Sequence, residues 1–257
     1  MKKWVNGFFA AFSMYSTLPM PQVQWREDTM QYVFCFFPWI GVLTGGLCLA
    51  WNWLCGYFQI GEMLFAGGMT LIPLAVSGGI HLDGLIDTAD ALYSRREREK
   101  KLEILKDPHV GAFGVIACGG YLLASFSLWG QLYGSWRWIA VCCVGFFLSR
   151  CCSALAVVSF PAAKQSGLAH LFSGYADRKM VRICCGAYLA AGCALLILLG
   201  GWHSAVVPLA MGLALAGFYR LCRRQFGGIT GDLAGFFLQI SELAVLAACT
   251  VGGVLAW

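Results

Sequence analysis

Seven stretches of this chain are almost wholly apolar, and each is long enough to cross a lipid bilayer as a helix, which takes roughly 20 residues. Only 12% of the residues are charged and 59% are hydrophobic, whereas soluble proteins carry about 25% charged residues. We therefore expect an all-α fold, a polytopic integral membrane helical bundle of about seven transmembrane helices. The expected spans are 34–56, 63–80, 110–130, 138–160, 183–200, 204–221 and 234–256.

The N-terminal segment, 1–30, contains a shorter apolar stretch that leads into PMPQ and not into a small-residue cleavage site. We expect residues 4–16 to form a helix in or near the membrane interface. The thirteen cysteines include no CxxC pair, and most lie inside apolar runs, so we expect buried thiols that pack as small hydrophobic groups.

Lysine and arginine are distributed very unevenly between the connections. Sixteen of the 18 lie in the N-terminal segment or in the connections 81–109, 161–182 and 219–231, whereas 57–62, 131–137 and 201–203 hold only Arg137. Because cytoplasmic loops are enriched in these residues, we expect a multi-pass membrane protein with a cytoplasmic N-terminus. The run SRREREKK, 94–101, is typical of a solvated helix that sets this topology.

The segment HLDGLIDTADAL, 81–92, places three aspartates at spacings of four and three. On a helix, Asp83, Asp87 and Asp90 project from one stripe, where their charges repel. Hard divalent cations such as Mg²⁺ take oxygen ligands of this kind, so the stripe predicts a metal site; the alternative is a solvated acidic helix end. His81 points elsewhere if the helix includes it, and is a candidate base if the helix begins later.

Two further polar segments lie on the same predicted face. In KDPHVGAFG, 106–114, Lys106 and His109 precede a helix start, where phosphate is attracted, although an ordinary interface loop would look similar. In RQFGGITGDLAGFFLQISE, 224–242, Gly228 and Gly231 allow close approach of a ligand to the backbone, and Asp232 stands at the membrane edge.

Two ionisable residues fall inside predicted spans. Glu242 lies about 15 Å along the helix from Asp232, and Arg150 lies within 138–160. Charges at this depth face the bundle interior and are paired or functional. Two roles for Arg150 stay open: a structural pair with Glu242, or a contact with a substrate phosphate.

The segments GGIHLDGLIDTADAL, KDPHVGAFGVIA and GGITGDLAGFFLQISE, in this order and spacing, closely resemble the cobalamin synthase family of adenosylcobinamide-GDP ribazoletransferases. The resemblance spans almost the whole chain and implies one catalytic domain, 1–257, embedded in the cell inner membrane. Its acidic-motif loop is expected at 81–109, with the active site on the cytoplasmic side. It implies a Mg²⁺-dependent transferase that joins adenosylcobinamide-GDP to α-ribazole, or to its 5′-phosphate, and releases GMP. We also expect contact with membrane lipid and no binding of nucleic acid. Whether the protein forms a homo-oligomer stays open.

The family resemblance, together with the chemistry above, assigns roles to individual residues. The catalytic candidates are Asp83, Asp87, Asp232 and His81. The metal candidates are Asp83, Asp87, Asp90 and Asp232. The substrate-binding candidates are Lys106, His109, Arg150, Gly228 and Gly231. Three positions depart from the pattern of many relatives: Thr17 and His109 replace arginine, and Gln239 replaces glutamate.

Two other functions fit parts of the sequence. An ion-coupled transporter would use membrane acids such as Glu242 at the midplane, but the aspartates cluster at one surface. A membrane CDP-alcohol phosphotransferase uses similar metal-binding aspartates, yet Asp83 and Gly84 are followed here by LIDTAD, without the arginine usual in that group.

Overall fold

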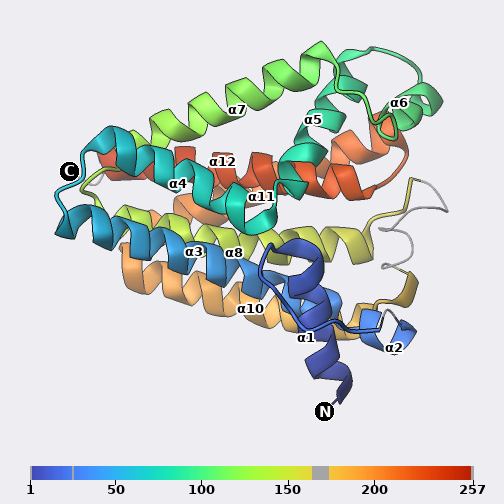
Figure 1. Ribbon diagram of the computed structural model, residues 1–257, viewed down its shortest axis with the longest axis horizontal. Coiled ribbons are helices and arrows are strands. Elements are labelled where there is room, and N and C mark those ends of the chain that lie inside the picture. Colours follow the sequence, from blue (N-terminus) through green and yellow to red (C-terminus); the bar gives the residue numbers. More distant parts are fainter. Residues whose placement is uncertain (1, 25, 164–173, 256–257) are drawn as a thin grey trace.

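The structure is a computed structural model that describes residues 2–24, 26–163 and 174–255. Its long helices lie side by side along one axis and form an elongated bundle (Figure 1). The longest are α3 (Val33–Tyr57), α7 (Ala112–Gln131), α8 (Trp136–Ser159), α10 (Arg178–Gly200) and α12 (Gly231–Leu255). The shorter ones are α1 (Lys2–Tyr15), α2 (Glu27–Met30), α4 (Glu62–Ser77), α5 (Ile80–Tyr93), α6 (Arg98–Ile104), α11 (Val206–Leu221), the 3₁₀-helix η1 (Gly201–Ala205) and the π-helix η2 (Cys222–Phe226).

Helix α8 is the centre of the bundle, and most of its side chains are buried against α3, α10 and α12. Glycines allow the backbones to approach closely: a Cβ on Gly45 of α3 would lie 2.8 Å from the carbonyl oxygen of Cys143, and one on Gly41 would clash with the carbonyl of Phe146. Small residues at this spacing are typical of helix contacts in membranes, where van der Waals packing drives association.

The count of spans differs from the predicted seven. Within the described residues, five helical stretches are long and apolar enough to cross a membrane, or six if α4 and α5 count together as one broken span. One of the five, Arg178–Phe226, contains two helices, α10 and α11. Gly201 (φ 63°) interrupts the helix between them, and the chain reverses its direction there (Figure 1). Each of the seven predicted segments is helical over most of its described residues, but α4 and α11 have only 16 residues each. The all-α, multi-pass membrane bundle is confirmed.

Helices α4 and α5 meet at 94°, so α5 does not continue along the bundle axis and lies across its end. Gly78 (φ 63°) and Gly79 (φ 79°) make this bend, since both take left-handed backbone angles that favour glycine. Thr17 closes it: its amide donates to the carbonyl of Val76 at 2.8 Å, and its hydroxyl donates to that of Ala75 at 2.9 Å. The predicted span 63–80 therefore ends earlier, and the predicted loop 81–109 contains α5 and α6.

The connections that hold most of the lysine and arginine gather with others at one end of the bundle, which we call the polar end (Figure 1, right). Within the described residues it comprises 16–24, 26–32, 94–111, 161–163 and 222–230. The short connections 58–61, 132–135 and 201–205 lie at the opposite end. Helix α1 packs against α3 at the polar end; its place relative to the membrane interface stays a prediction. The thirteen cysteines are all free and ten are buried, as expected.

Candidate active site

The site forms where α5 crosses the first turns of α12 at the polar end. Two glycines let the helices touch: a Cβ on Gly84 would lie 2.5 Å from the carbonyl oxygen of Asp232, and one on Gly235 would lie 3.3 Å from the backbone of His81. No larger residue fits at Gly84 without separating the helices. The aspartates of α5 are thereby brought to Asp232, 142 or more residues away along the chain.

The charges of the other candidate acids act on the carboxyl group of Asp87. Burial, and then the charges of Asp83, Asp232 and Asp90, raise the pKa of Asp87 to about 7. Like charges nearby disfavour a further negative charge. A cation bound among the acids would lower this pKa again, because it would stabilise the ionised carboxyl.

Asp90 has a defined structural role. Its two carboxylate oxygens accept hydrogen bonds from the backbone amides of Gly111, at 2.8 Å, and Gly114, at 2.9 Å, at the N-terminus of α7. Helix α7 begins at Ala112, so Asp90 caps the positive end of its dipole from α5. Either glycine would collide with this carboxylate if it carried a Cβ.

The donor set suits a hard cation, but it is not a closed cage. In the part of the chain that the structure describes, no three acidic, histidine or cysteine side chains converge on one metal position. Mg²⁺ is usually held by one or two carboxylates and completes its shell with water and substrate phosphate oxygens. The exposed Asp83 and the part-buried Asp87 and Asp232 fit such an open site, whereas both oxygens of Asp90 are already engaged. The Mg²⁺ site stays a prediction.

His81 lies inside the bundle and not beside the aspartates. It is 4% exposed, and its ring faces Tyr15 and Phe37, at centroid distances of 6.3 and 6.0 Å. Its Nε2 has no hydrogen-bond partner among the described residues. Because α5 already includes His81, the helical geometry turns it away from Asp83, and we do not assign it the role of base.

The sequence left two roles open for Arg150, and in the structure this residue forms the ion pair with Glu242. Its Nη1 donates to Glu242 Oε1 at 2.7 Å and to the carbonyl of Phe146 at 2.8 Å, and Ser149 also donates to Glu242. The arginine is 1% exposed, so it has almost no surface open to a ligand from outside the bundle. We therefore do not assign Arg150 to substrate binding.

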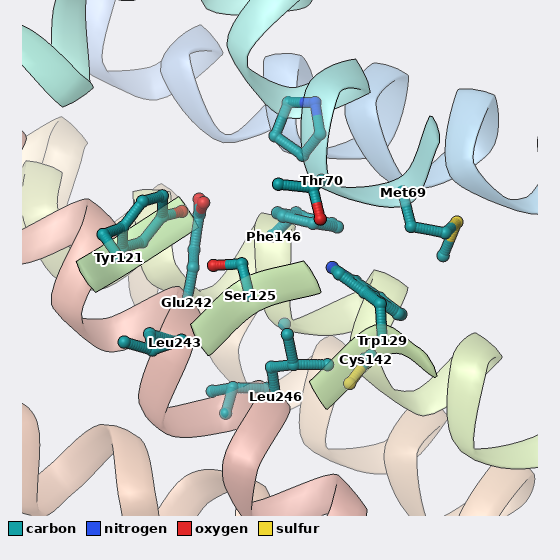
Figure 2. Close-up of a pocket in the computed structure, with 13 residues that line it drawn as sticks. Met69, Thr70, Tyr121, Ser125, Trp129, Cys142, Phe146, Glu242, Leu243 and Leu246 are labelled. Carbon is teal, nitrogen blue, oxygen red and sulfur yellow. The ribbon is translucent and has the colours of Figure 1, made fainter. Parts of the chain in front are cut away.

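Glu242 also lines a cavity between α4, α7, α8 and α12 (Figure 2). Its carboxyl group and the hydroxyl groups of Tyr121, Ser125 and Thr70 are the oxygens drawn there, among mostly apolar side chains. This is the place where an ion-coupled transporter would bind its ion. The charge of Glu242 is already matched by Arg150, which argues against that alternative.

Lys106 and His109 lie exposed at the polar end, in the connection between α6 and α7. His109 Nδ1 lies 2.7 Å from Asp107 Oδ1, and hydrogen bonds from His109 lower the pKa of Asp107. Both positions are open to a soluble ligand. Their substrate-binding roles stay predictions.

Gly228 serves the backbone packing. A Cβ there would collide with the carbonyl of Pro161, and the adjacent Ile229 donates to that carbonyl at 2.8 Å and accepts from Ala163 at 3.0 Å. The glycine is buried by the protein itself, whereas Gly231 is exposed at the start of α12. Ligand contact at either glycine stays untested.

Sequence reasoning missed Gly84 and Gly235 as the residues that assemble the site. Both stood within quoted motifs, but glycine is common in this chain, with 32 residues, so the two were not distinguished. Their spacing could have pointed to them. Gly84 directly follows Asp83, and Gly235 lies about one helical turn after Asp232, so both glycines lie beside candidate acids on the two helices that cross.

The fold and the acidic cluster together define a polytopic membrane protein with a candidate phosphoryl-transfer site at one end of its bundle. The model of the cobalamin-5-phosphate synthase family matches residues 7–250. The chain belongs to this family and is a transferase.

Curated relatives match over nearly the full chain. An adenosylcobinamide-GDP ribazoletransferase of Lachnoclostridium phytofermentans is 39% identical over 256 residues, covering 99% of this chain and 97% of its own. Proteins of the same name from Desulfitobacterium hafniense and Clostridium botulinum (strain Alaska E43) are 33% and 31% identical, covering 95% and 97% of this chain and 94% and 99% of their own. No solved structure matches the chain.

Proposed function

We propose that this protein is an adenosylcobinamide-GDP ribazoletransferase whose active site is the α5–α12 crossing. The full-length match to relatives of that name carries the proposal. The grouping of Asp83, Asp87 and Asp232 at the polar end supports it, because phosphoryl transfer needs a cation beside the phosphates and little covalent chemistry from the protein.

In the proposed reaction, a ribose hydroxyl oxygen of α-ribazole, or a free ribose hydroxyl of its 5′-phosphate, forms a bond to the phosphorus nearest the aminopropanol arm of adenosylcobinamide-GDP. The bond from that phosphorus to the bridging oxygen breaks, and GMP leaves with the electron pair. The hydroxyl proton passes to a carboxylate or to water. The products are adenosylcobalamin, or its 5′-phosphate, and GMP.

We assign Asp83, Asp87 and Asp232 as the residues that would hold Mg²⁺. When bound, Mg²⁺ would neutralise charge on the diphosphate oxygens and align them for transfer. Lys106 would add a positive charge from the neighbouring exposed connection, and Asp232 is the candidate proton acceptor. Asp90 would act indirectly, by fixing the start of α7 against α5.

The proposed orientation places the polar end in the cytoplasm of the inner membrane. Lysine and arginine concentrated in the connections of this end favour that side. Adenosylcobinamide-GDP is large and carries a charged diphosphate, so a site at the mouth of the bundle avoids moving it into the bilayer.

The test is a turnover assay with protein purified in detergent. We expect GMP release from adenosylcobinamide-GDP only when α-ribazole, or its phosphate, and Mg²⁺ are both present. Asp87→Asn should lower turnover at least about a hundredfold. The matched control is Glu99→Gln on α6, which removes an exposed carboxylate outside the site and should retain wild-type turnover. Full activity of folded Asp87→Asn would exclude the assigned metal site.

A further inference from the structure

A recess at the polar end, separate from the aspartates, collects positive charge. It lies between the connection after α5, α6, the end of α11 and η2, and encloses about 950 Å³, including the solvent at its mouth. We call it the basic recess; its lining residues are Leu92, Arg95, Lys101, Arg220, Leu221, Arg224 and Gln225.

The lining holds four cations and, in the part of the chain described, no acidic residue. Lys101 is 7% exposed, although its run SRREREKK is expected to be solvated. Its ammonium group donates to Gln225 Oε1, a neutral acceptor. The ammonium group of Lys101 and the guanidinium groups of Arg95, Arg220 and Arg224 share this recess, where like charges repel one another. A bound anion would offset this repulsion.

The backbone at the recess is irregular on both sides. Arg95 has φ 53°, in the left-handed region that costs energy for a residue other than glycine. Opposite it, η2 is a π-helix, and one-turn π-helices occur frequently at functional sites. Arg220 and Arg224 are four residues apart and line the same recess from the end of α11 and η2.

Arg223 shows that this arrangement is selective. It lies between Leu221 and Arg224 in sequence, yet its guanidinium stacks over the ring of Tyr219, 5.7 Å from the centroid, and donates to the Tyr219 hydroxyl. Only two of the three arginines at this turn therefore line the recess.

We propose that the basic recess is a binding site for a phosphate group. Arginine forks and a lysine ammonium are the donors that phosphate oxygens prefer, and several convergent cations suit a dianion or a diphosphate. The phosphate belongs either to a soluble phosphate ester or to the head group of an anionic lipid, since the recess opens at the end of a membrane bundle.

The test measures binding and not turnover, so its outcome is independent of the proposed reaction. Purified protein in an uncharged detergent with EDTA is titrated with inorganic pyrophosphate, followed by calorimetry. In a second arm, the protein is placed in nanodiscs of phosphatidylcholine that contain about 10% phosphatidylglycerol, an anionic lipid. Native mass spectrometry then counts the phosphatidylglycerol molecules that the protein retains. EDTA removes any cation that would bind pyrophosphate at the aspartates.

We expect saturable binding in at least one arm, and that arm identifies the source of the phosphate. Arg220→Gln/Arg224→Gln should weaken it at least tenfold. The matched control, Arg96→Gln/Arg223→Gln, removes the same charge from neighbouring positions outside the recess and should bind like wild type. All four positions are exposed, so both variants should fold. Equal binding by the two double variants, or no binding in either arm, would overturn the proposal.

Discussion

Gly84 lies against Asp232 so closely that a Cβ on the glycine would come within 2.5 Å of the aspartate's carbonyl oxygen. This contact between α5 and α12 determines where the candidate acids meet. Since any side chain at Gly84 forces the helices apart, the geometry of the site depends on a residue that has no functional group of its own.

Gly84→Ala should therefore lower both stability and turnover. Overpacking a close contact costs about 1–3 kcal/mol, and the shift of α5 also moves Asp83 and Asp87 away from Asp232. Thermal unfolding in detergent and GMP release measure the two effects. Gly67→Ala on α4 is the control, because a Cβ there meets nothing within 4 Å. A Gly84→Ala protein that matches this control would contradict the crossing.

Asp90 and Asp87 should behave differently although both belong to one stripe. Asp90→Ala removes a carboxylate that accepts two backbone hydrogen bonds at a helix N-terminus, and should lower the free energy of unfolding by about 1–3 kcal/mol. Asp87→Asn removes a repelling charge and should leave stability unchanged or raise it. Thermal melts without Mg²⁺ make the comparison; equal destabilisation by both would refute the separate role of Asp90.

The pair of Arg150 and Glu242 predicts a recovery. Arg150→Leu alone leaves a buried carboxylate without its partner and should destabilise the protein by about 3–5 kcal/mol. Arg150→Leu/Glu242→Leu removes both charges and should regain most of that stability. Turnover of the folded double variant then tests whether Arg150 contacts a substrate phosphate. Near wild-type activity excludes that contact, whereas a stable but inactive protein would support it.

The orientation can be tested with reporters. A reporter fused at Lys100, in α6, should give a cytoplasmic signal, and one fused at Gly134, in the connection from α7 to α8, should not. Helix α6 and that connection lie at opposite ends of the bundle (Figure 1). Alkaline phosphatase and a fluorescent protein give complementary readouts. The reverse pattern would place the acidic site on the side of the membrane away from the cytoplasm and would contradict the proposed orientation.

The bundle was predictable because apolar length is a local property of the sequence. The bend at Gly78 and Gly79 was not predictable, because the apolar pattern of the sequence continues past both glycines to Ile80. The spacing of Asp83, Asp87 and Asp90 predicted one stripe correctly. It could not reveal that Asp90 is engaged by amides 21 and 24 residues further on, because that contact depends on where α7 begins.

Charged positions show the same division. The pairing of Arg150 with Glu242 was one of two readings, and the structure selects it because α8 and α12 pack together. Burial of Lys101 was unforeseen, since its neighbours in SRREREKK are all hydrophilic. The recess that buries it forms where the connection after α5, α6, the end of α11 and η2 come together in the fold.

The ion pair within the membrane also has a consequence for biosynthesis. Glu242 follows Arg150 by 92 residues, so the ribosome completes α8 well before it makes the carboxylate that neutralises the guanidinium. An unpaired arginine at the centre of a helix costs about 3 kcal/mol during insertion by the translocon. Final closure of the bundle therefore has to wait for the last helix of the nascent chain, and a polypeptide truncated before α12 would keep an uncompensated charge in the bilayer.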